Sequence, residues 1–386
     1  AFITKIDPYG NIEYSTYIGG SSGEEAYGIS VNGLGEVYIA GMTSSSDFPT
    51  TPDAISSSPT GSFLVKFNTV GDQILYASYI GDSTTALVGM VIDLNETVYM
   101  VSLGNPRYGT AFKLIPGNYS YEYVYSLGSG RWENIAIDES GNAYFTGRSN
   151  TQPYDVQAAS INANGTLVYS ITFGGSRDDR GWAVAVDSSG YAYITGETIS
   201  YDDFPVAGSP LTSSQLQDAF ITILDPLGSI VYSSYMNLNG NNEDGSSITV
   251  DSEGSIYIVG NTTSDDFPLT AGAVWNPGSN GHYYVYIVEL DALIPRTSYQ
   301  IAYATAIGGS GYDYVISTIG TTDQYGNVYV TGYTDSPDFV GTEGVSGDYT
   351  QAFAVKVSTE AVGAIPDEST YSSDCGPDSG ISCTAE

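Results

Sequence analysis

The chain has 386 residues, of which 44 are Asp or Glu and only 10 are Lys or Arg, so its formal net charge is −34 at pH 7. This balance excludes binding to nucleic acid or to an anionic membrane surface, because the chain cannot neutralise phosphate groups. Hydrophobic residues make up 41% of the sequence and aromatic residues 13%, which is the composition of a folded protein with a neutral polar surface.

The sequence has no apolar run of 18 or more residues, which excludes a membrane-spanning helix. Its first residues have the pattern of a β-strand and not that of a signal peptide. We therefore expect either a processed mature chain or part of a longer one.

One segment recurs six times along the chain, as in AYGISVNGLGEVYIAGMTSSSDFP from Ala26 and WAVAVDSSGYAYITGETISYDDFP from Trp182. The equivalent turn residue moves from Asn32 to Asp323 over five intervals, which gives a mean period of about 58 residues. The other copies begin near Val88, Trp132, Ser246 and Gly320.

A second motif alternates with the first and pairs a short apolar run with a Tyr-rich run, as in FLVKFNTVGDQILYASYIG. Each period therefore holds four strand-like runs of five to eight residues, separated by turns such as D-x-x-G. We expect the I-x-V-D run to be the innermost strand, followed by Y-[IV]-x-G, F-[IV]-x-K and Y-S-x-Y. In the D-x-x-G turn, Asp should cap backbone N–H groups and Gly should supply a positive φ.

Four strands per repeat with no helical stripe predict an all-β fold, a β-propeller of four-stranded blades with six or seven blades. A β-solenoid is the rival, but its turns need only about 20–30 residues each. The predicted propeller covers residues 1–357, with a C-terminal tail over 358–386. Its repeats lie near 26–80, 88–127, 132–173, 181–236, 246–307 and 313–357, closed by 1–20.

The run I-x-V-D-x-x-G-x-x-Y-[IV]-x-G-x-T-x-S-x-D-F-P, followed by F-[IV]-x-K and Y-S-[TS]-Y-[IL]-G-G, resembles the SBBP-type β-propeller repeat. The resemblance covers roughly residues 1–357 and implies a secreted or cell-surface protein. The second and third blades depart from the pattern because they lack D-F-P.

The two cysteines, Cys375 and Cys383, both lie in the polar tail and indicate a local disulfide, hence an oxidising compartment. The alternative is two free thiols. Four N-x-[ST] sequons also favour an extracellular location and are candidate glycosylation sites. The sequons are at Asn95, Asn118, Asn164 and Asn261.

Acidic loops are the remaining chemical signal, because their oxygen ligands suit calcium, although solvated loops are the simpler interpretation. The candidate calcium ligands are Asp178, Asp179, Asp202, Asp203, Asp265 and Asp266. The sequence has one histidine, His282, and contains no P-loop or H-E-x-x-H motif, so it offers no recognisable set of catalytic residues. We therefore expect the protein not to be an enzyme.

The first, second and outermost types of predicted strand each occur six times, whereas the third type occurs seven times. The first copy of the third type begins at Phe2 and the last begins at Ala352. One terminal strand could therefore pair with a neighbouring chain and build a homopolymer or lattice. A missing half-blade upstream, or a loosely packed end in a monomer, are alternatives. The candidate assembly residues are Phe2, Ile3, Ile6, Phe353, Val355 and Val357.

These observations favour a non-enzymatic structural protein, a propeller subunit of an extracellular filament or surface layer. The second hypothesis is a secreted module that binds glycans or a protein partner through loops at 199–218 and 262–283. A polysaccharide-active enzyme is the third.

Overall fold

The computed structural model describes twelve stretches of the chain and contains no helix in any of them. These are residues 1–103, 109–117, 119–213, 216–239, 242–264, 266–273, 282–294, 296–315, 320–323, 326–339, 351–358 and 381–382. The chain divides into two compact units, Ala1–Phe173 and Gly174–Glu386, and this division falls between the third and fourth predicted repeats. No helix in the described residues is long and apolar enough to cross a membrane.

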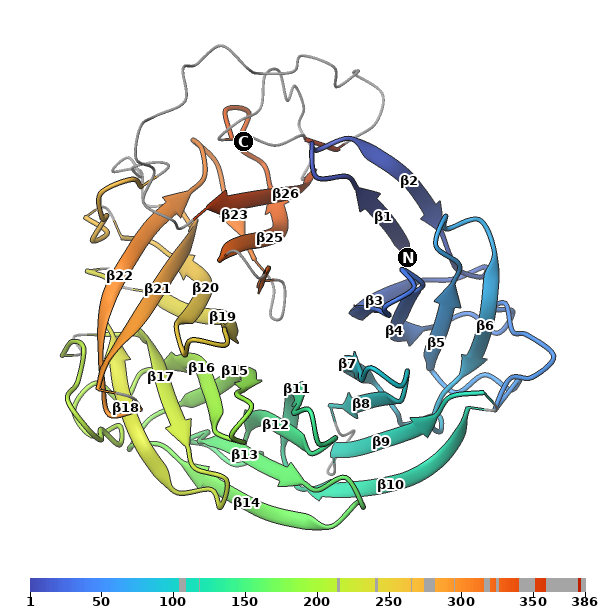
Figure 1. Ribbon diagram of the computed structural model, residues 1–386, viewed down its shortest axis with the longest axis horizontal. Helices are drawn as coiled ribbons and strands as arrows, with labels where there is room; N and C mark the ends of the chain where they lie inside the picture. Colours follow the sequence, from blue (N-terminus) through green and yellow to red (C-terminus); the bar gives the residue numbers. More distant parts are fainter. Residues whose placement is uncertain are drawn as a thin grey trace. The chain divides into compact units, whose positions relative to one another are not determined.

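The first unit begins with a two-stranded antiparallel sheet and continues with three four-stranded antiparallel sheets (Figure 1). The two-stranded sheet is β1 (Phe2–Ile6) and β2 (Ile12–Tyr17). The first four-stranded sheet is β3 (Glu24–Val31), β4 (Val37–Thr43), β5 (Ser62–Phe67) and β6 (Ile74–Tyr79). The second is β7 (Leu87–Ile92), β8 (Val98–Ser102), β9 (Gly109–Ile115) and β10 (Ser120–Gly128). The third is β11 (Arg131–Ile137), β12 (Ala143–Arg148), β13 (Val156–Ile161) and β14 (Leu167–Phe173).

The second unit holds two more four-stranded sheets and a sixth sheet of different composition. The fourth sheet is β15 (Asp179–Val186), β16 (Ala192–Thr198), β17 (Asp218–Leu224) and β18 (Ile230–Met236). The fifth is β19 (Glu243–Val250), β20 (Ile256–Thr262), β21 (Tyr284–Ile294) and β22 (Ser298–Ile307). The sixth contains β23 (Asp313–Tyr314), β24 (Gly320–Thr322), β25 (Asn327–Thr334), β26 (Gln351–Ser358) and β27 (Ile381–Ser382).

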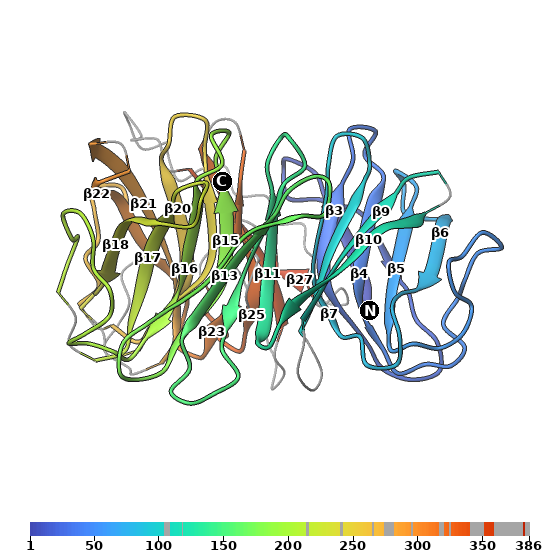
Figure 2. The same cartoon turned by 90° about the horizontal axis from the view of Figure 1, so that it is seen from below.

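In each four-stranded sheet the strands are hydrogen-bonded in the order in which they follow along the chain. Figure 2 shows this for β3 to β6 and for β15 to β18, which lie in sequence order in the turned view as well. This order matches the predicted sequence of inner, second, third and outer strands. The prediction of an all-β fold built from propeller blades is confirmed, and the described residues form six blades.

The D-x-x-G turn between the first two strands of a blade has the predicted chemistry. In the third blade, Asp138 Oδ1 accepts the backbone N–H groups of Ser140 and Asn142, both at 2.9 Å. Gly141 has a φ of 78°, in the left-handed region that favours glycine. Asp138 Oδ2 accepts the Tyr144 hydroxyl at 3.1 Å, so the turn also fixes a tyrosine of the second strand.

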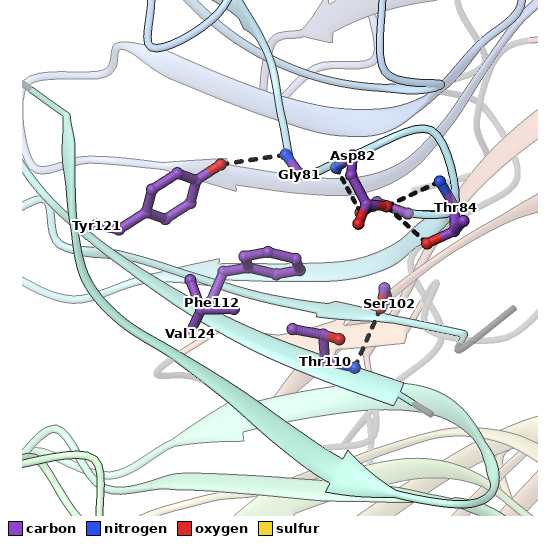
Figure 3. A pocket seen from close by; sticks show the side chains of 9 residues that line it. Gly81, Asp82, Thr84, Ser102, Thr110, Phe112, Tyr121 and Val124 are labelled. Carbon is purple, nitrogen blue, oxygen red and sulfur yellow. Dashed lines mark hydrogen bonds between the residues drawn. The ribbon is translucent and has the colours of Figure 1, made fainter. Parts of the chain in front are cut away.

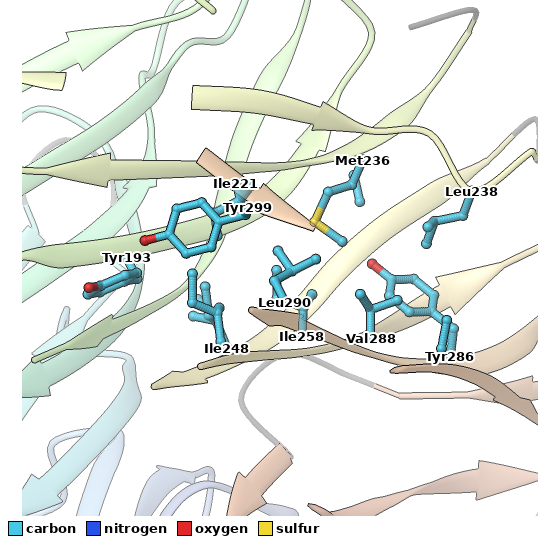
Figure 4. Close-up of a cluster of buried hydrophobic side chains, with 14 of the residues drawn as sticks. Tyr193, Ile221, Met236, Leu238, Ile248, Ile258, Tyr286, Val288, Leu290 and Tyr299 are labelled. Carbon is cyan, nitrogen blue, oxygen red and sulfur yellow. The ribbon is translucent and has the colours of Figure 1, made fainter. Parts of the chain in front are cut away.

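Apolar side chains of adjacent blades pack together and form the core of each unit. In the second unit, Ile221, Ile248 and Val288 belong to one cluster that also includes the buried rings of Tyr193 and Tyr286 (Figure 4). These residues alternate along their strands with residues of the opposite face, which is the two-residue period read from the sequence. Burial of both faces of each sheet explains why β17 is buried along its whole length.

The D-F-P segment between the second and third strands places a phenylalanine ring against aromatic side chains of the third and outer strands. In the first blade these three residues are Phe48, Phe63 and Tyr79, and we call this group the aromatic plug. In the first blade, Phe48 stacks on Phe63 with ring centroids 4.7 Å apart. The Tyr79 hydroxyl accepts the Phe48 N–H at 3.1 Å and donates to Ser45 O at 2.8 Å. The fourth blade repeats this arrangement, in a set made of Phe204, Phe220, Tyr235 and Ser200. The motif that identifies the repeat is therefore a packing element that locks the outer strand.

Candidate functional site

A buried carboxylate network recurs at the start of several blades. Asp179 is fully buried and accepts the Thr198 hydroxyl at 2.5 Å and the Ser200 hydroxyl at 3.0 Å. The backbone N–H of Gly175 donates to the same carboxylate at 2.7 Å. Asp313 has equivalent partners in the sixth blade, and burial raises its pKa despite these hydrogen bonds. Asp179 thus has a structural role, because its carboxylate accepts hydrogen bonds from groups of its own blade.

The other candidate calcium ligands do not converge. Asp178 Oδ2 lies 3.6 Å from Arg180 Nη2, and Asp202 Oδ1 lies 2.6 Å from Arg177 Nη1. The Arg177 guanidinium holds the pKa of Asp202 below its ordinary value. Asp203 and Asp266 are exposed, and Asp265 lies outside the described residues. In the described stretches no group of three or more His, Cys, Asp or Glu residues is placed to hold a metal ion.

The predicted glycosylation sites differ in accessibility. Asn95 and Asn164 are exposed in turns, whereas Asn118 lies outside the described residues. Asn261 is fully buried in β20; its Nδ2 donates to Asp244 and to Val315 O, and its Oδ1 accepts the Val315 N–H at 2.8 Å. The structure therefore removes Asn261 from the set of accessible acceptor sites. Cys375 and Cys383 lie outside the described residues.

The β1–β2 sheet carries exposed aromatic side chains where the complete blades bury theirs. The pattern FITKI in β1 matches FLVKF in β5, which places Phe2 at the position of Phe63. Phe2 is 53% exposed and Phe63 is 0% exposed. Similarly, Tyr17 in β2 matches Tyr79 in β6, and their exposed fractions are 86% and 1%.

The remaining assembly candidates are at least partly covered. Ile3 is buried and Ile6 is half-buried. In β26, Phe353 and Val357 are buried and Val355 is half-buried. The rings of Phe353 and Phe339 are stacked with centroids 4.6 Å apart, as those of Phe63 and Phe48 are in the first blade.

The sixth sheet has its first three strand positions filled and differs from the others at the fourth. β23 and β24 both pair with β25 and together take the first position, and β26 takes the third. The outer edge of β26 meets β27, which pairs in parallel through only two residues, Ile381 and Ser382. None of the described strands of this sheet has the antiparallel Tyr-rich pattern of a fourth strand. The sheets β1–β2 and β23–β27 are thus the two departures from the four-stranded blade.

Comparison with known protein families agrees with the repeat read from the sequence. The Beta-propeller repeat model named SBBP matches residues 13–49, 168–205 and 231–268. Each matched segment contains an outer strand, the connection to a first strand, and a second strand, and the segment itself ends with the D-F-P that follows the second strand. The search of curated proteins finds no match.

Solved structures similar to this chain include hydrazine synthase from Kuenenia stuttgartiensis. That match has a TM-score of 0.51 and 10% identity, and covers 82% of this chain and 78% of that one. A streptogramin B lyase structure matches with a TM-score of 0.45 and 14% identity, over 85% of this chain and 94% of that one. At such low identity these likenesses concern the fold alone. The chain thus has a β-propeller fold and matches the SBBP Beta-propeller repeat model at three regions.

Proposed function

We propose that this protein is a non-enzymatic structural module that assembles with copies of itself by exchange of terminal strands, as a subunit of a cell-surface filament or layer. The observation that carries the proposal is the exposed aromatic face of β1–β2. Phe2 and Tyr17 have the positions of Phe63 and Tyr79 but not their burial.

Burial of these two side chains supplies a driving force. A large aromatic side chain buries about 150–250 Å² when it is fully covered, and about 25 cal/mol is gained per Å² of apolar surface. Covering the exposed parts of Phe2 and Tyr17, 53% and 86% of these residues, would therefore contribute on the order of 5–9 kcal/mol before the entropic cost of association. Among the described residues β1 pairs only with β2, so its second edge also offers main-chain hydrogen bonds to an added strand.

The sixth sheet is the complementary surface. β1 and β26 share the third-strand pattern, as FITKI and FAVKV show, and among the described residues β1 is followed by an antiparallel fourth strand whereas β26 is not. A β1–β2 hairpin from a second copy would complete this sheet at the cost of displacing β26. Tyr17 would then reach the loop that contains Ser336 and Phe339, as Tyr79 reaches Ser45 and Phe48 in the first blade.

The first experiment measures the assembly state of the full chain by light scattering and negative-stain microscopy. We expect ordered oligomers for the natural sequence and monomers for the double variant Phe2→Ser, Tyr17→Ser. The matched control is Tyr9→Ser, since Tyr9 is also strongly exposed but lies in the turn between β1 and β2. Equal assembly of the double variant and the control would overturn the proposal.

A cross-link locates the contact. In the sixth sheet Val330 of β25 is paired with Val355 of β26, and Thr4 holds the position of Val355 in β1. A chain with Thr4→Cys and Val330→Cys, and with Cys375 and Cys383 replaced by Ser, should form a ladder of disulfide-linked oligomers under mild oxidation. A cross-link confined to single chains, or no cross-link at all, would contradict exchange between copies.

A further inference from the structure

A cavity of about 300 Å³ lies in the first unit, on the side of the second blade that faces the β6–β7 loop (Figure 3). Its floor is the ring of Phe112, with Val124 and Tyr121 from the neighbouring strand. Its polar wall consists of Gly81, Asp82, Thr84, Thr85, Ser102 and Thr110. This volume is at the lower end of the range of about 300–1,000 Å³ that small-molecule sites occupy.

Strand register shows why the cavity exists at this blade. In the first blade Ala40 pairs with Leu64, so Phe63 is the next residue toward the strand start. In the second blade Val101 pairs with Ala111, so Thr110 holds the place of Phe63. Thr110 in turn pairs with Ser126, which holds the place of Tyr79. Two of the three aromatic groups of the plug are therefore replaced by small hydroxyl side chains.

The third aromatic group of the plug is missing from the sequence. Only residues 103–108 connect β8 to β9, and the segment LGNPRY has neither D-F-P nor any phenylalanine. In the first blade the corresponding connection delivers Phe48 onto Phe63. The small side chains at Thr110 and Ser126 lie on the face of the sheet that the cavity occupies, and the ring of Phe112 forms the floor of the cavity.

The polar groups of the wall retain hydrogen-bonding capacity. The Tyr121 hydroxyl accepts the Gly81 N–H at 3.1 Å, so its own hydrogen remains available to donate. Burial raises the pKa of Tyr121, which keeps this hydroxyl protonated. Ser102 Oγ accepts the Thr110 N–H at 3.1 Å, and no hydrogen bond from its hydroxyl to another described residue is present.

Asp82 adds an ionised acceptor. The side-chain hydrogen bond from Thr84 is the main cause that lowers the pKa of Asp82. Its hydrogen bonds from Thr84 and Thr85 all end on Oδ1, and none of the described residues donates to Oδ2. The described residues that line the cavity include no Lys or Arg, and the chain carries a net charge of −34. An anionic ligand is therefore disfavoured.

We propose that this cavity binds one neutral sugar ring, such as the terminal residue of a glycan. Phe112 is only 4% exposed, so the apolar surface offered to one face of a pyranose comes mainly from Val124, which is 55% exposed, while the Tyr121, Ser102, Thr110 and Asp82 groups suit its hydroxyls. A purely apolar ligand would leave those hydroxyls and the carboxylate without partners, at a cost in binding free energy. This site is separate from the strand edges of the proposed assembly.

The experiment applies saturation-transfer difference NMR to the full chain with a panel of neutral monosaccharides and their oligomers: glucose, galactose, mannose and N-acetylglucosamine. We expect signal on the ring protons of at least one sugar. Thr110→Phe restores the aromatic residue found at this place in the first blade and should fill the cavity, which lowers affinity at least tenfold. Thr110→Ser keeps both the hydroxyl and the space, and is the matched control.

Two further measurements complete the test. Tyr121→Phe removes one donor and should weaken binding several-fold, while thermal unfolding of Thr110→Phe should show that the fold is retained. Absence of any sugar signal, or equal binding by Thr110→Phe and Thr110→Ser, would overturn the proposal. The assembly state should be the same in both Thr110 variants, so failure here and failure of strand exchange are distinguishable.

Discussion

Arg296 donates from Nε and Nη2 to Asp187 Oδ2, at 3.2 and 2.8 Å, across 109 residues of sequence. Its guanidinium also lies 4.1 Å from the ring centroid of Tyr191. Asp187 Oδ1 meanwhile accepts the N–H groups of Ser189 and Tyr191, so one carboxylate both closes its own turn and binds the following blade. This contact joins the turn after β21 to the turn between β15 and β16.

Arg296→Ala should lower the free energy of unfolding of the chain by about 1.5–3 kcal/mol, because the substitution removes charge-assisted hydrogen bonds to a largely buried carboxylate. Urea denaturation monitored by circular dichroism measures the difference. Arg148→Ala is the control, since Arg148 stacks on Tyr154 at 4.0 Å and none of its described contacts is a carboxylate. An Arg296→Ala effect no larger than that of Arg148→Ala would contradict the assigned role.

Asp244 should make stability depend on pH. Burial, the largest cause, raises the pKa of Asp244 to about 6 from its ordinary 3.8, although Ser246 and Asn261 donate to it. The folded chain therefore binds this proton more tightly than the unfolded chain, and the free energy of unfolding falls as pH rises from about 4 to about 6. The contribution is on the order of 3 kcal/mol and is constant above that window.

Thermal unfolding of Asp244→Asn between pH 3 and pH 8 measures this effect, and the variant should show a flatter curve than the natural chain through that window. Asp225→Asn is an opposite-sign control. Hydrogen bonds, above all that from the Ser229 N–H, lower the pKa of Asp225, so its contribution is present above its ordinary pKa and lost as pH falls. Parallel curves for Asp244→Asn and the natural chain would refute the prediction.

Glycans on native material should occupy Asn95 and Asn164 and be absent from Asn261. The first two side chains are exposed in turns, whereas Asn261 makes its hydrogen bonds inside the fifth blade. Peptide mass spectrometry with and without enzymatic deglycosylation checks each site. A glycan found on Asn261 in folded protein would contradict the buried network, and bare Asn95 and Asn164 would contradict the glycosylation itself.

Local patterns in the sequence predicted what depends on local geometry. The two-residue period gave the strands, and the D-x-x-G spacing gave the turn, because Asp138 and its partners lie within six residues of one another. Adjacent acidic residues make Asp178 and Asp179 candidate calcium ligands in the sequence, and the structural role of Asp179 is not visible there because its partners, Thr198 and Ser200, are about 20 residues away. A sequon likewise does not show which face of a strand it occupies, so the burial of Asn261 was not predictable.

The cavity could not be predicted from the sequence for a related reason. The sequence showed that the second blade lacks D-F-P, but register was needed to place Thr110 and Ser126 at the positions of Phe63 and Tyr79. Only the paired strands show that these two replacements fall at one point of one face. An interrupted repeat is therefore informative for function once its register is known.

The two incomplete sheets have a consequence for growth. Among the described residues, the β1–β2 sheet has no inner strands and the sixth sheet has no antiparallel outer strand, so a contact between them would join unlike surfaces. Such a contact has no two-fold axis, and every subunit added would point the same way. The resulting polymer would be polar, with two chemically distinct tips. A peptide of residues 1–20 would occupy one tip alone and act as a terminator of elongation.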